Sequence, residues 1–276
     1  NNQSITDGDL MSGTLQMAHT GNVACVTIDH PARFNAMSRA MWVQLKAVFE
    51  QIQHNRDIRC VVIQGEGAHF CAGGDISEYA DFRFEESSLR HFHEVEVWGG
   101  LQAMLNCDVP IVAQIDGNCM GAGVELASCC DIRLSSMSAQ FGAPIAKLGF
   151  PMAPREAALV MRELGATVAR HMLLAARLFS AAELSASGFL SQVVAGEHLA
   201  GEVQALTQRI VGLAPQAARL NKQTLRGINR PLDHSPPAQV AIEVIANEPP
   251  NAYLYAASAE HREGVMAFLQ KRKPVF

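Results

Sequence analysis

The chain has 276 residues, 49% apolar and 18% charged, which is the composition of a globular protein with one large or two modest domains. Its formal net charge of -5 offers no general attraction to nucleic acid or to an anionic membrane. The seven cysteines show no C-x-x-C spacing, and the chain carries no 18-residue apolar span and no signal-peptide pattern. We therefore expect a cytoplasmic protein with free buried thiols and with neither nucleic acid nor membrane as a partner.

The N-terminal part of the chain predicts a hairpin followed by a helix. Residues 1–13 are polar and aperiodic, so they are left out of the fold prediction. Residues 14–29 form two alternating apolar runs that break at the turn-rich residues 20–22, which predicts a β-hairpin. Ser38 is a suitable N-cap for a helix over residues 39–55, where apolar residues recur at three- and four-residue spacing.

Strand and helix signals alternate up to about residue 200. Short apolar runs predict strands over residues 60–65, 111–117 and 131–142, and helix-like segments cover residues 92–106 and 124–130. Such alternation is typical of the α/β class. From Ala200 onward the strand signals disappear and helical periodicity takes over, which predicts a helical C-terminal region.

Two glycine-rich turns stand between a predicted strand and a predicted helix, GEGAHFCAGGDI at 65–76 and DGNCMGAG at 116–123. At such a turn unpaired backbone N–H groups and the positive end of the helix dipole converge, which suits an oxygen anion. Two turns that face each other would hold one carbonyl oxygen with two N–H donors. Glu125, about one helical turn beyond Gly121, would then lie close enough to carry a proton.

Other interpretations of these residues stay open. The turn at 121–123 suits simple close packing, and it resembles the start of a dinucleotide fingerprint, although Leu126 occupies the place of the third glycine. A lone glutamate on an apolar helix is more often ion-paired or at the helix edge than catalytic. Cys71 has no histidine placed by sequence to activate it, which favours packing over nucleophilic catalysis. His91 and His93 point different ways on a helix and lack a further ligand, so no metal site is predicted.

Five motifs together resemble the crotonase superfamily, whose members include enoyl-coenzyme A hydratases and isomerases. They are NAMS at 35–38, FCAGGDI at 70–76, IDG-x-x-x-GAG-x-E-x-x-x-x-CDI at 115–132, AQFGAP at 139–144 and HREGVMAFLQKRKPVF at 261–276. The resemblance implies a spiral of ββα units over residues 14–199 and a helical oligomerisation and coenzyme A-capping region over residues 200–276. It also implies that the backbone amides of Gly74 and Ala122 form an oxyanion hole and that Glu125 is the acid/base.

The same resemblance places coenzyme A along two loops, as part of a thioester substrate and with no tightly bound cofactor. The residues implied are Arg33, Phe34, Ala36, Ala72, Gly73, Asp75 and Ile76. Phe268 and Lys271 would approach the nucleotide, often from a neighbouring subunit, and the basic residues 271–273 suit phosphate groups. Basic residues that complement the dipole of a solvated helix end would explain the same charges without a ligand.

The sequence departs from the hydratase pattern at two positions. Hydratases of this superfamily use two glutamates, and the second position is Ile145 here, while Met152 stands where a glycine commonly helps to seat water. The next acidic residue, Glu156, we expect on the surface of the following helix.

These departures leave several functions open. A single glutamate suits double-bond isomerisation or elimination, although many one-glutamate isomerases of the family keep that residue at position 145. Hydration with Glu125 alone would be slower by roughly 10²- to 10⁴-fold. A non-catalytic acyl-CoA-binding or RNA-binding homologue is a further alternative, and the net charge argues against RNA.

The helical C-terminal region also predicts self-association. Its apolar positions, such as Leu206, Ile210 and Val211, cannot all be buried within so small an appendage. We therefore expect a homotrimer or a dimer of trimers.

Overall fold

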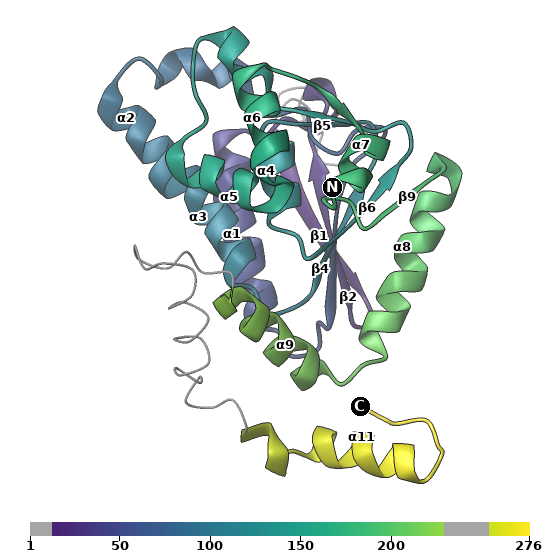
Figure 1. Ribbon diagram of the computed structural model, residues 1–276. Coiled ribbons are helices and arrows are strands. Elements are labelled where there is room, and N and C mark those ends of the chain that lie inside the picture. Colours follow the sequence, from purple (N-terminus) through teal and green to yellow (C-terminus); the bar gives the residue numbers. More distant parts are fainter. Residues whose placement is uncertain (1–12, 229–253) are drawn as a thin grey trace, which may run out of the picture.

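A computed structural model describes residues 13–228 and 254–276, and two β-sheets organise the first of these ranges (Figure 1). The strands of the larger sheet lie in the order β1 (Thr14–Thr20), β2 (Val23–Asp29), β3 (Cys60–Gly65), β4 (Ile111–Ile115), β6 (Ile132–Ser136) and β9 (Gln192–Val194). β1 and β2 are antiparallel and form the expected hairpin, and the other neighbours are parallel. The smaller sheet has the order β5 (Asn118–Met120), β7 (Gln140–Gly142) and β8 (Phe179–Ser180).

Twice along the chain a strand of the large sheet is followed by a strand of the small sheet and then by a helix. β4 leads to β5 and then to α4 (Ala122–Ser128), and β6 leads to β7 and, after a 3₁₀ turn (Pro144–Leu148), to α5 (Pro154–Leu164). After β3, Cys71 makes an isolated parallel bridge to Cys119 of β5 before the chain becomes helical. The expected α/β spiral of ββα units is therefore confirmed.

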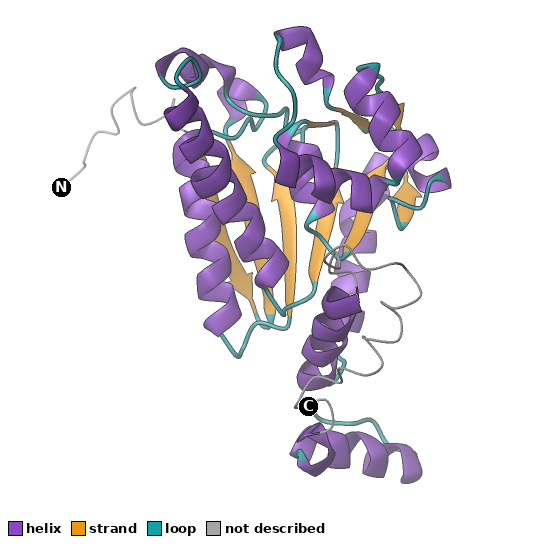
Figure 2. Ribbon diagram, turned by 60° about the vertical axis from the view of Figure 1, so that its left-hand side comes forward, coloured by secondary structure: helices purple, strands orange, loops and turns teal. Residues whose placement is uncertain are grey.

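Helices cover both faces of the large sheet (Figure 2). On one face α1 (Arg39–His54) packs beside α3 (Trp98–Asn106), and Ser38 caps α1 by accepting a hydrogen bond from Met41 N over 3.3 Å. The opposite face is covered by α8 (Gly196–Val211). Alternate residues of β3 take part in the two cores: Val61 and Ile63 pack in the α1 core, whereas Cys60 and Val62 pack beneath α8. Two separate apolar cores thus hold the sheet rigidly between helices.

The helix predicted over residues 92–106 is longer and less regular than expected. A 3₁₀ segment (Ile76–Asp81) comes first, and helical structure then continues from α2 (Glu86–His91) through a π-helical segment (Phe92–Val97) into α3. A π turn changes the direction in which the following side chains point. Periodicity alone did not show this change.

Several elements were not predicted. They are the short strands β5, β8 and β9, the 3₁₀ turn η1 (Pro31–Arg33), and the helices α6 (Ala166–Leu174) and α7 (Ala181–Ala186). Each of these strands has two or three residues, too few for an alternating pattern to be visible. The irregular start predicted for residues 1–13 lies outside the described residues except for Gly13.

The C-terminal part is helical, as predicted, and contains α8, α9 (Pro215–Ile228), a 3₁₀ turn (Leu254–Ala257) and α11 (Ala259–Leu269). One expectation was wrong. Ile210 is buried and Leu206 and Val211 are half-buried, because α8 packs onto the large sheet and not outward. Those three positions therefore give no reason to predict self-association. No helix among the described residues is both long and apolar enough to cross a membrane.

Candidate active site

The two glycine-rich turns lie against each other. Cys71 N donates to Asn118 O over 3.0 Å, and Met120 N donates to Cys71 O over 2.8 Å, so the first turn is paired with β5. Gly123 completes the contact, because a β-carbon at this position would lie 2.6 Å from Cys71 O. Only a residue without a side chain fits there. The start of α4 is therefore held directly against residues 71–74.

The backbone amides of Gly74 and Ala122 have no hydrogen-bond acceptor among the described residues, and the same holds for their neighbours Gly73 and Gly123. Gly74 bridges to Met37, but its two neighbours make the hydrogen bonds of that bridge. Ala122 is the first residue of α4, where no preceding helical turn supplies an acceptor. Gly121 before it has a φ of 48°, a conformation that glycine adopts without strain. Unpaired amides at the start of a helix can donate to an oxygen that becomes negatively charged.

Glu125 lies in the first turn of α4, a helix in which every residue is buried, and is 6% exposed. Burial raises the pKa of Glu125 well above its ordinary value, and the negative charge of Glu156 raises it further. Burial also raises the pKa of the Cys71 thiol to about 12, and the charge of Glu125 adds to this effect. The charge of Glu125 is therefore felt at the first glycine turn, where Cys71 lies. Cys71 is a neutral packing residue and not a nucleophile.

The far end of α4 is fixed by Arg133 of β6, which is buried. Its guanidinium donates to the carbonyl oxygens of Ala127 over 3.2 Å, Cys130 over 2.5 Å and Phe189 over 2.6 Å. The first two carbonyls lie at the C-terminal end of α4, where a positive charge complements the helix dipole. Both ends of the helix that carries Glu125 are thus held in place, which the sequence did not predict.

Glu156 is buried, so the expectation that it lies on a helix surface was wrong. It is 3% exposed, and its Oε1 atom is 2.8 Å from Nδ1 of His93. Glu156 shares the buried face of α5 with Leu159, Val160 and Leu164, at helical spacing. That spacing was a usable signal in the sequence, because a glutamate in register with three core residues points towards the core.

The two histidines of the neighbouring helix face different partners. His91 Nε2 lies 3.6 Å from Glu96 Oε1, whereas His93 faces Glu156. Within residues 13–228 and 254–276, no three His, Cys, Asp or Glu side chains gather in a way that could hold a metal ion.

Tyr79 and Arg83 are further site residues that the sequence analysis missed. The Arg83 guanidinium lies 4.5 Å from the ring centre of Tyr79 and 4.0 Å from that of Phe150, and so stacks on both rings. A β-carbon on Gly74 would collide with the Tyr79 hydroxyl. Burial raises the pKa of Tyr79 to about 12, Arg83 opposes this effect, and the charges of Glu125 and Glu156 add to it. The phenol therefore lies over the first glycine turn and near both carboxylates.

The two loops that the resemblance assigned to coenzyme A are joined by main-chain hydrogen bonds. Ala72 N donates to Phe34 O over 3.0 Å, and Met37 N donates to Gly73 O over 2.8 Å. Asn35 is 1% exposed and donates to Glu66 O and His69 O over 2.8 and 2.6 Å. This side chain, not predicted as a site residue, fastens the first loop to the turn that follows β3.

The predicted coenzyme A residues in these loops differ in exposure. The side chains of Phe34 and Ile76 are 60% and 54% exposed, and Arg33 is also exposed. Ala36 is buried, and Asp75 is an N-cap whose Oδ1 accepts from Ser77 N over 3.0 Å. Two apolar side chains and one cation are thus available at this edge for a ligand.

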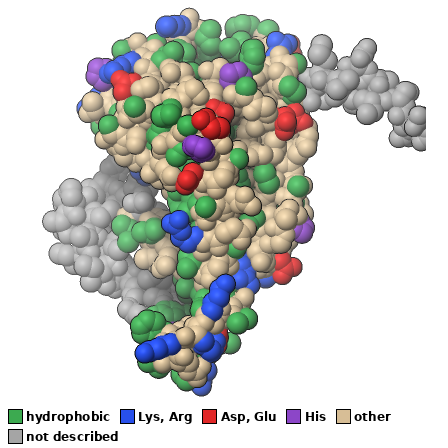
Figure 3. All heavy atoms as spheres, turned by 90° about the vertical axis from the view of Figure 1, so that its right-hand side faces the viewer, with side chains coloured by type: hydrophobic (Ala, Val, Ile, Leu, Met, Phe, Trp, Pro, Cys, Tyr) green, Lys and Arg blue, Asp and Glu red, His purple; other side chains and the backbone are tan. Residues whose placement is uncertain are grey.

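Phe268 and Lys271 do not join these loops within one chain. Arg59, just before β3, donates to Phe276 O over 2.8 Å, so the C-terminus lies at the amino end of β3. The glycine turn lies beyond the opposite end of the same strand, and α11 lies at the lower end of the molecule (Figure 1). Phe268 is 83% exposed. In the view onto the α8 side, Lys and Arg side chains gather towards this lower end (Figure 3).

Both positions that depart from the hydratase pattern are apolar and half-buried. Ile145 lies in the 3₁₀ turn between β7 and α5. Met152 packs against the main core just before α5.

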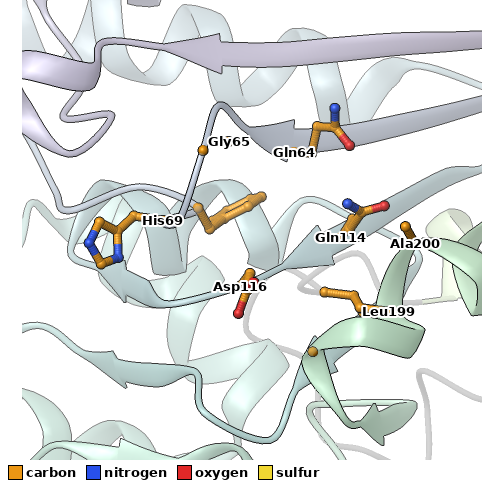
Figure 4. A pocket seen from close by; sticks show the side chains of 10 residues that line it. Gln64, Gly65, His69, Gln114, Asp116, Leu199 and Ala200 are labelled. Carbon is orange, nitrogen blue, oxygen red and sulfur yellow. The ribbon is translucent and has the colours of Figure 1, made fainter.

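A separate cavity of about 90 Å³ opens where β3 and β4 end and α8 begins (Figure 4). Its walls include Gln64, His69, Gln114, Asp116 and Leu199. Asp116 Oδ1 already accepts from Ser136 Oγ over 2.5 Å, and His69 Nδ1 accepts from Asn118 N over 3.1 Å. These polar groups hold the turns in place, and we assign no chemistry to the cavity.

Comparison with known proteins identifies the family of this chain. The family model described as enoyl-CoA hydratase/isomerase matches residues 18–276. The chain therefore belongs to the enoyl-CoA hydratase/isomerase family of the crotonase superfamily.

Individual relatives extend along almost the whole chain. A 2,3-dehydroadipyl-CoA hydratase from Escherichia coli is 29% identical over 255 residues, covering 92% of this chain and 94% of the relative. A short-chain-enoyl-CoA hydratase from Clostridium acetobutylicum is also 29% identical and covers 92% and 93%. A crystal structure of an enoyl-CoA hydratase/carnithine racemase from Magnetospirillum magneticum is 34% identical, with a TM-score of 0.86 and coverage of 95% and 94%.

Proposed function

We propose that this chain acts on acyl-coenzyme A thioesters, holding the thioester oxygen with the backbone amides of Gly74 and Ala122 and moving a proton with Glu125. The observation that carries this proposal is the combination of two unpaired amides at facing turns with a buried glutamate in the first turn of α4. Membership of the family supports the substrate class, since both curated relatives described above are named as hydratases of CoA thioesters.

The chemistry follows from where negative charge develops. Glu125 in its ionised form takes a proton from the carbon next to the thioester carbonyl, and the electron pair moves onto the carbonyl oxygen. The two amides donate to that oxygen more strongly once it is charged, which stabilises the enolate relative to the bound substrate. A raised pKa makes Glu125 a stronger base than an exposed glutamate. The proton can then return to the same carbon or to another one.

Two reactions that pass through an enolate are candidates, each with an observation in its favour. In hydration of a 2-enoyl-CoA the enolate forms when water adds to the β-carbon and gives up a proton to a base, and the carbon next to the carbonyl then takes up a proton. The names of the relatives favour this reaction. Double-bond isomerisation, or another enolate reaction without water, is favoured by Ile145, because isoleucine cannot activate water at the position of the second hydratase glutamate. A homologue that binds acyl-CoA without turning it over is the alternative if Glu125 has no catalytic role.

Product analysis separates these possibilities. The protein is incubated in heavy-oxygen water with saturated, 2-enoyl, 3-enoyl and 3-hydroxyacyl-CoA thioesters. Label in the product shows hydration, and a shifted double bond without label shows isomerisation. Glu125→Gln keeps the shape of the side chain but cannot accept the proton, so we expect turnover to fall by roughly 10²- to 10⁴-fold with thioester binding retained. Full turnover by Glu125→Gln would refute the mechanism.

We also propose that coenzyme A binds along the loops of residues 33–36 and 72–76, as part of the substrate. Phe34 and Ile76 offer exposed apolar surface there. Since Phe268 and Lys271 lie at the other end of the sheet in the same chain, the nucleotide would meet Lys271 of the partner subunit, in a homotrimer or a dimer of trimers. Exposed apolar side chains of α9 and α11, including Leu225 and Phe268, support such assembly.

Sedimentation and binding measurements test this arrangement. We expect a trimer or hexamer at micromolar concentration, and a stable monomer would contradict it. Removing the charges of residues 271–273 should weaken binding of free coenzyme A and reduce the dependence of this binding on salt. An unchanged affinity would place the nucleotide elsewhere.

We further propose that the protein works in the cytoplasm with no tightly bound cofactor. All seven cysteines are free and six are buried, which suits a reducing compartment. Turnover by extensively dialysed protein is the expected result. Activity that is lost on dialysis and restored by an added metal or cofactor would contradict this proposal.

A further inference from the structure

A second buried carboxylate lies behind the proposed catalytic glutamate. Glu156 starts a helix that packs directly against α4, and it is 3% exposed. Its one hydrogen-bond partner among the described residues is His93, at 2.8 Å. Burial of a carboxylate is unfavourable unless the group is hydrogen-bonded, so the contact with His93 is what makes this position tolerable. Neither the family pattern nor the proposed mechanism uses Glu156.

The surroundings of His93 determine which of its nitrogens carries the proton. Nε2 of His93 lies 3.5 Å from Nη1 of Arg83. A guanidinium has only donors, so this contact assigns the acceptor role to Nε2 and a proton to Nδ1. His93 therefore donates from Nδ1 to the Glu156 carboxylate over 2.8 Å.

Glu125 has the opposite surroundings. Its carboxylate makes no hydrogen bond with any side chain or amide in the described part of the chain, and it keeps a small exposed area. The two carboxylates interact, because the charge of Glu156 is one of the two causes that raise the pKa of Glu125. A pair of carboxyl groups with such different hydrogen bonding shares its protons unequally. Within the pair, Glu125 is the carboxyl group whose pKa is raised.

We propose that Glu156, held by His93, is a positioning residue that sets the protonation of Glu125 through its fixed negative charge. The inference rests on the proposed function, in which Glu125 carries the proton. Glu156 itself need not touch the substrate. Its charge makes Glu125 a stronger base in the ionised form.

Among the ionisable groups around Glu125 and Glu156, the neighbouring thiols and the phenol are neutral, so Glu156 is the principal charge that acts on Glu125. Cys71 on the glycine turn and Cys129 on α4 have pKa values raised by burial, to about 12 and well above 9.0, so both thiols stay neutral. Tyr79 above the turn also stays neutral, with its pKa raised to about 12. Arg83, the one cation stacked on Tyr79, lies on the far side of His93 from Glu156.

Infrared titration tests the proposal without a substrate. A buried protonated carboxyl group gives a C=O stretching band, and the band of Glu125 is identified by its loss in Glu125→Gln. In Glu156→Gln the amide oxygen still accepts from His93 but carries no charge. We expect the midpoint of the Glu125 band to move to lower pH. An unchanged midpoint in a folded Glu156→Gln protein would overturn the proposal.

Glu94→Gln is the matched control. Glu94 lies next to His93 in sequence, is about one third exposed and faces Arg155 over 3.3 Å, so the variant also removes one negative charge near α5. We expect no shift of the Glu125 band, because an exposed charge is screened by water. A shift as large as that in Glu156→Gln would overturn the proposal, since any nearby charge would then have the same effect.

Kinetics supply a readout that a purely structural role of Glu156 would not change. Deuterium exchange at the carbon next to the carbonyl of a saturated acyl-CoA measures enolate formation whatever the later reaction is. In Glu156→Gln the acidic limb of the kcat profile should move to lower pH. Its plateau should fall by less than the 10²- to 10⁴-fold loss of Glu125→Gln, with KM nearly constant. A uniform loss at every pH would overturn the proposal.

If Glu156→Gln does not fold, the variant His93→Leu tests the same proposal by removing the hydrogen-bond donor of Glu156. Without the Nδ1 donor, part of the shared proton should move onto Glu156 and give a second carboxyl band beside that of Glu125. A single unchanged band would overturn the proposal. Failure of the proposed function would look different, because Glu125→Gln would then retain turnover while the infrared shifts still occurred.

Discussion

Replacing Gly123 by alanine tests whether the contact between the two turns controls the reaction. The added β-carbon would lie 2.6 Å from Cys71 O and 3.1 Å from Cys71 Cβ, whereas ordinary contact begins at 3.4 Å. The obstructing atom is a main-chain carbonyl, which already accepts a hydrogen bond from Met120 N and cannot rotate away. The start of α4 must therefore move by about 0.8 Å, the difference between ordinary contact and the present separation.

Two opposing effects set the stability of Gly123→Ala. Alanine favours a helix over glycine by about 1 kcal/mol. Overpacking of a rigid interior costs about 1 to 3 kcal/mol, so the strain should exceed the gain in helix propensity. We expect a net loss of about 1 kcal/mol in the free energy of unfolding, measured by urea denaturation at fixed protein concentration. The catalytic effect should be larger, since a shift of about 1 Å at a reacting centre can reduce the rate roughly 100-fold.

Gly201→Ala is the control for this experiment. Gly201 lies inside α8, and a β-carbon there would meet nothing within 4 Å. This variant should gain about 0.5 to 1 kcal/mol from helix propensity and keep its activity. In the deuterium-exchange assay we expect kcat/KM of Gly123→Ala to be roughly 10 to 100 times lower than that of Gly201→Ala. Equal activity of the two variants would refute the reasoning that the turn contact places the Ala122 amide and Glu125.

Three further predictions follow from burial. The pKa of Glu125 is raised above its ordinary value of 4.5 in the folded state, so the folded protein binds more protons than the unfolded chain and loses stability as pH rises between the two values. Relative to the wild type, Glu125→Gln should therefore gain stability as pH rises above about 4.5. The gain should reach about 1.4 kcal/mol for each unit by which folding raises the pKa of Glu125. The measurement is urea unfolding of both proteins at pH 4.5 and 8, and the same difference in free energy of unfolding at both pH values would contradict the prediction. The Cys71 thiol, with a pKa raised to about 12, should resist alkylation in the native protein at pH 8. Mass spectrometry measures the extent of alkylation, and rapid modification of Cys71 would be inconsistent with the structure. Asn35→Ala removes two hydrogen bonds that Asn35 donates to Glu66 O and His69 O and one that it accepts from His30 N. It should lower the free energy of unfolding by about 2 to 4 kcal/mol, and a loss below about 1 kcal/mol would show that other contacts hold these segments together.

The longer elements could be predicted because local signals and burial agree in them. Ser38 before residues of helical periodicity predicted the start of α1, and the structure shows that its side chain caps the helix. The hairpin of residues 14–29 was equally clear, since a turn-rich triplet separates two alternating runs. In these segments the faces that the sequence makes apolar are the faces that the fold buries.

The short strands could not be predicted, because their pairing is decided by distant residues. β8 has two residues, Phe179 and Ser180, and exists only because Phe141 of β7 lies beside it. α8 shows a related difficulty. Its apolar stripe indicated a buried face, but nothing local showed that this face would pack on the second side of the sheet and not against another subunit.

The candidate site was predictable in its main-chain parts and less so in its side-chain parts. Glycine turns before helices indicate where unpaired amides occur, and the structure shows Gly74 and Ala122 with unpaired amides. The contribution of Glu156 and Tyr79 depends on how α5 and the 3₁₀ segment fold back over α4, which involves contacts between residues tens of positions apart. For Glu156 a helical spacing with three core residues was visible in the sequence, and it should have counted against a surface position.

The packing of α5 against α4 brings a second carboxylate, Glu156, towards Glu125. The resemblance implies that the second glutamate of hydratases would stand at Ile145, in the connection before α5. The first turn of α5 supplies Glu156 instead, but His93 occupies its hydrogen-bonding side. If Glu156 adjusts the basicity of Glu125 without exchanging protons with a substrate, as we propose, the site favours reactions that need one proton carrier over those that need two.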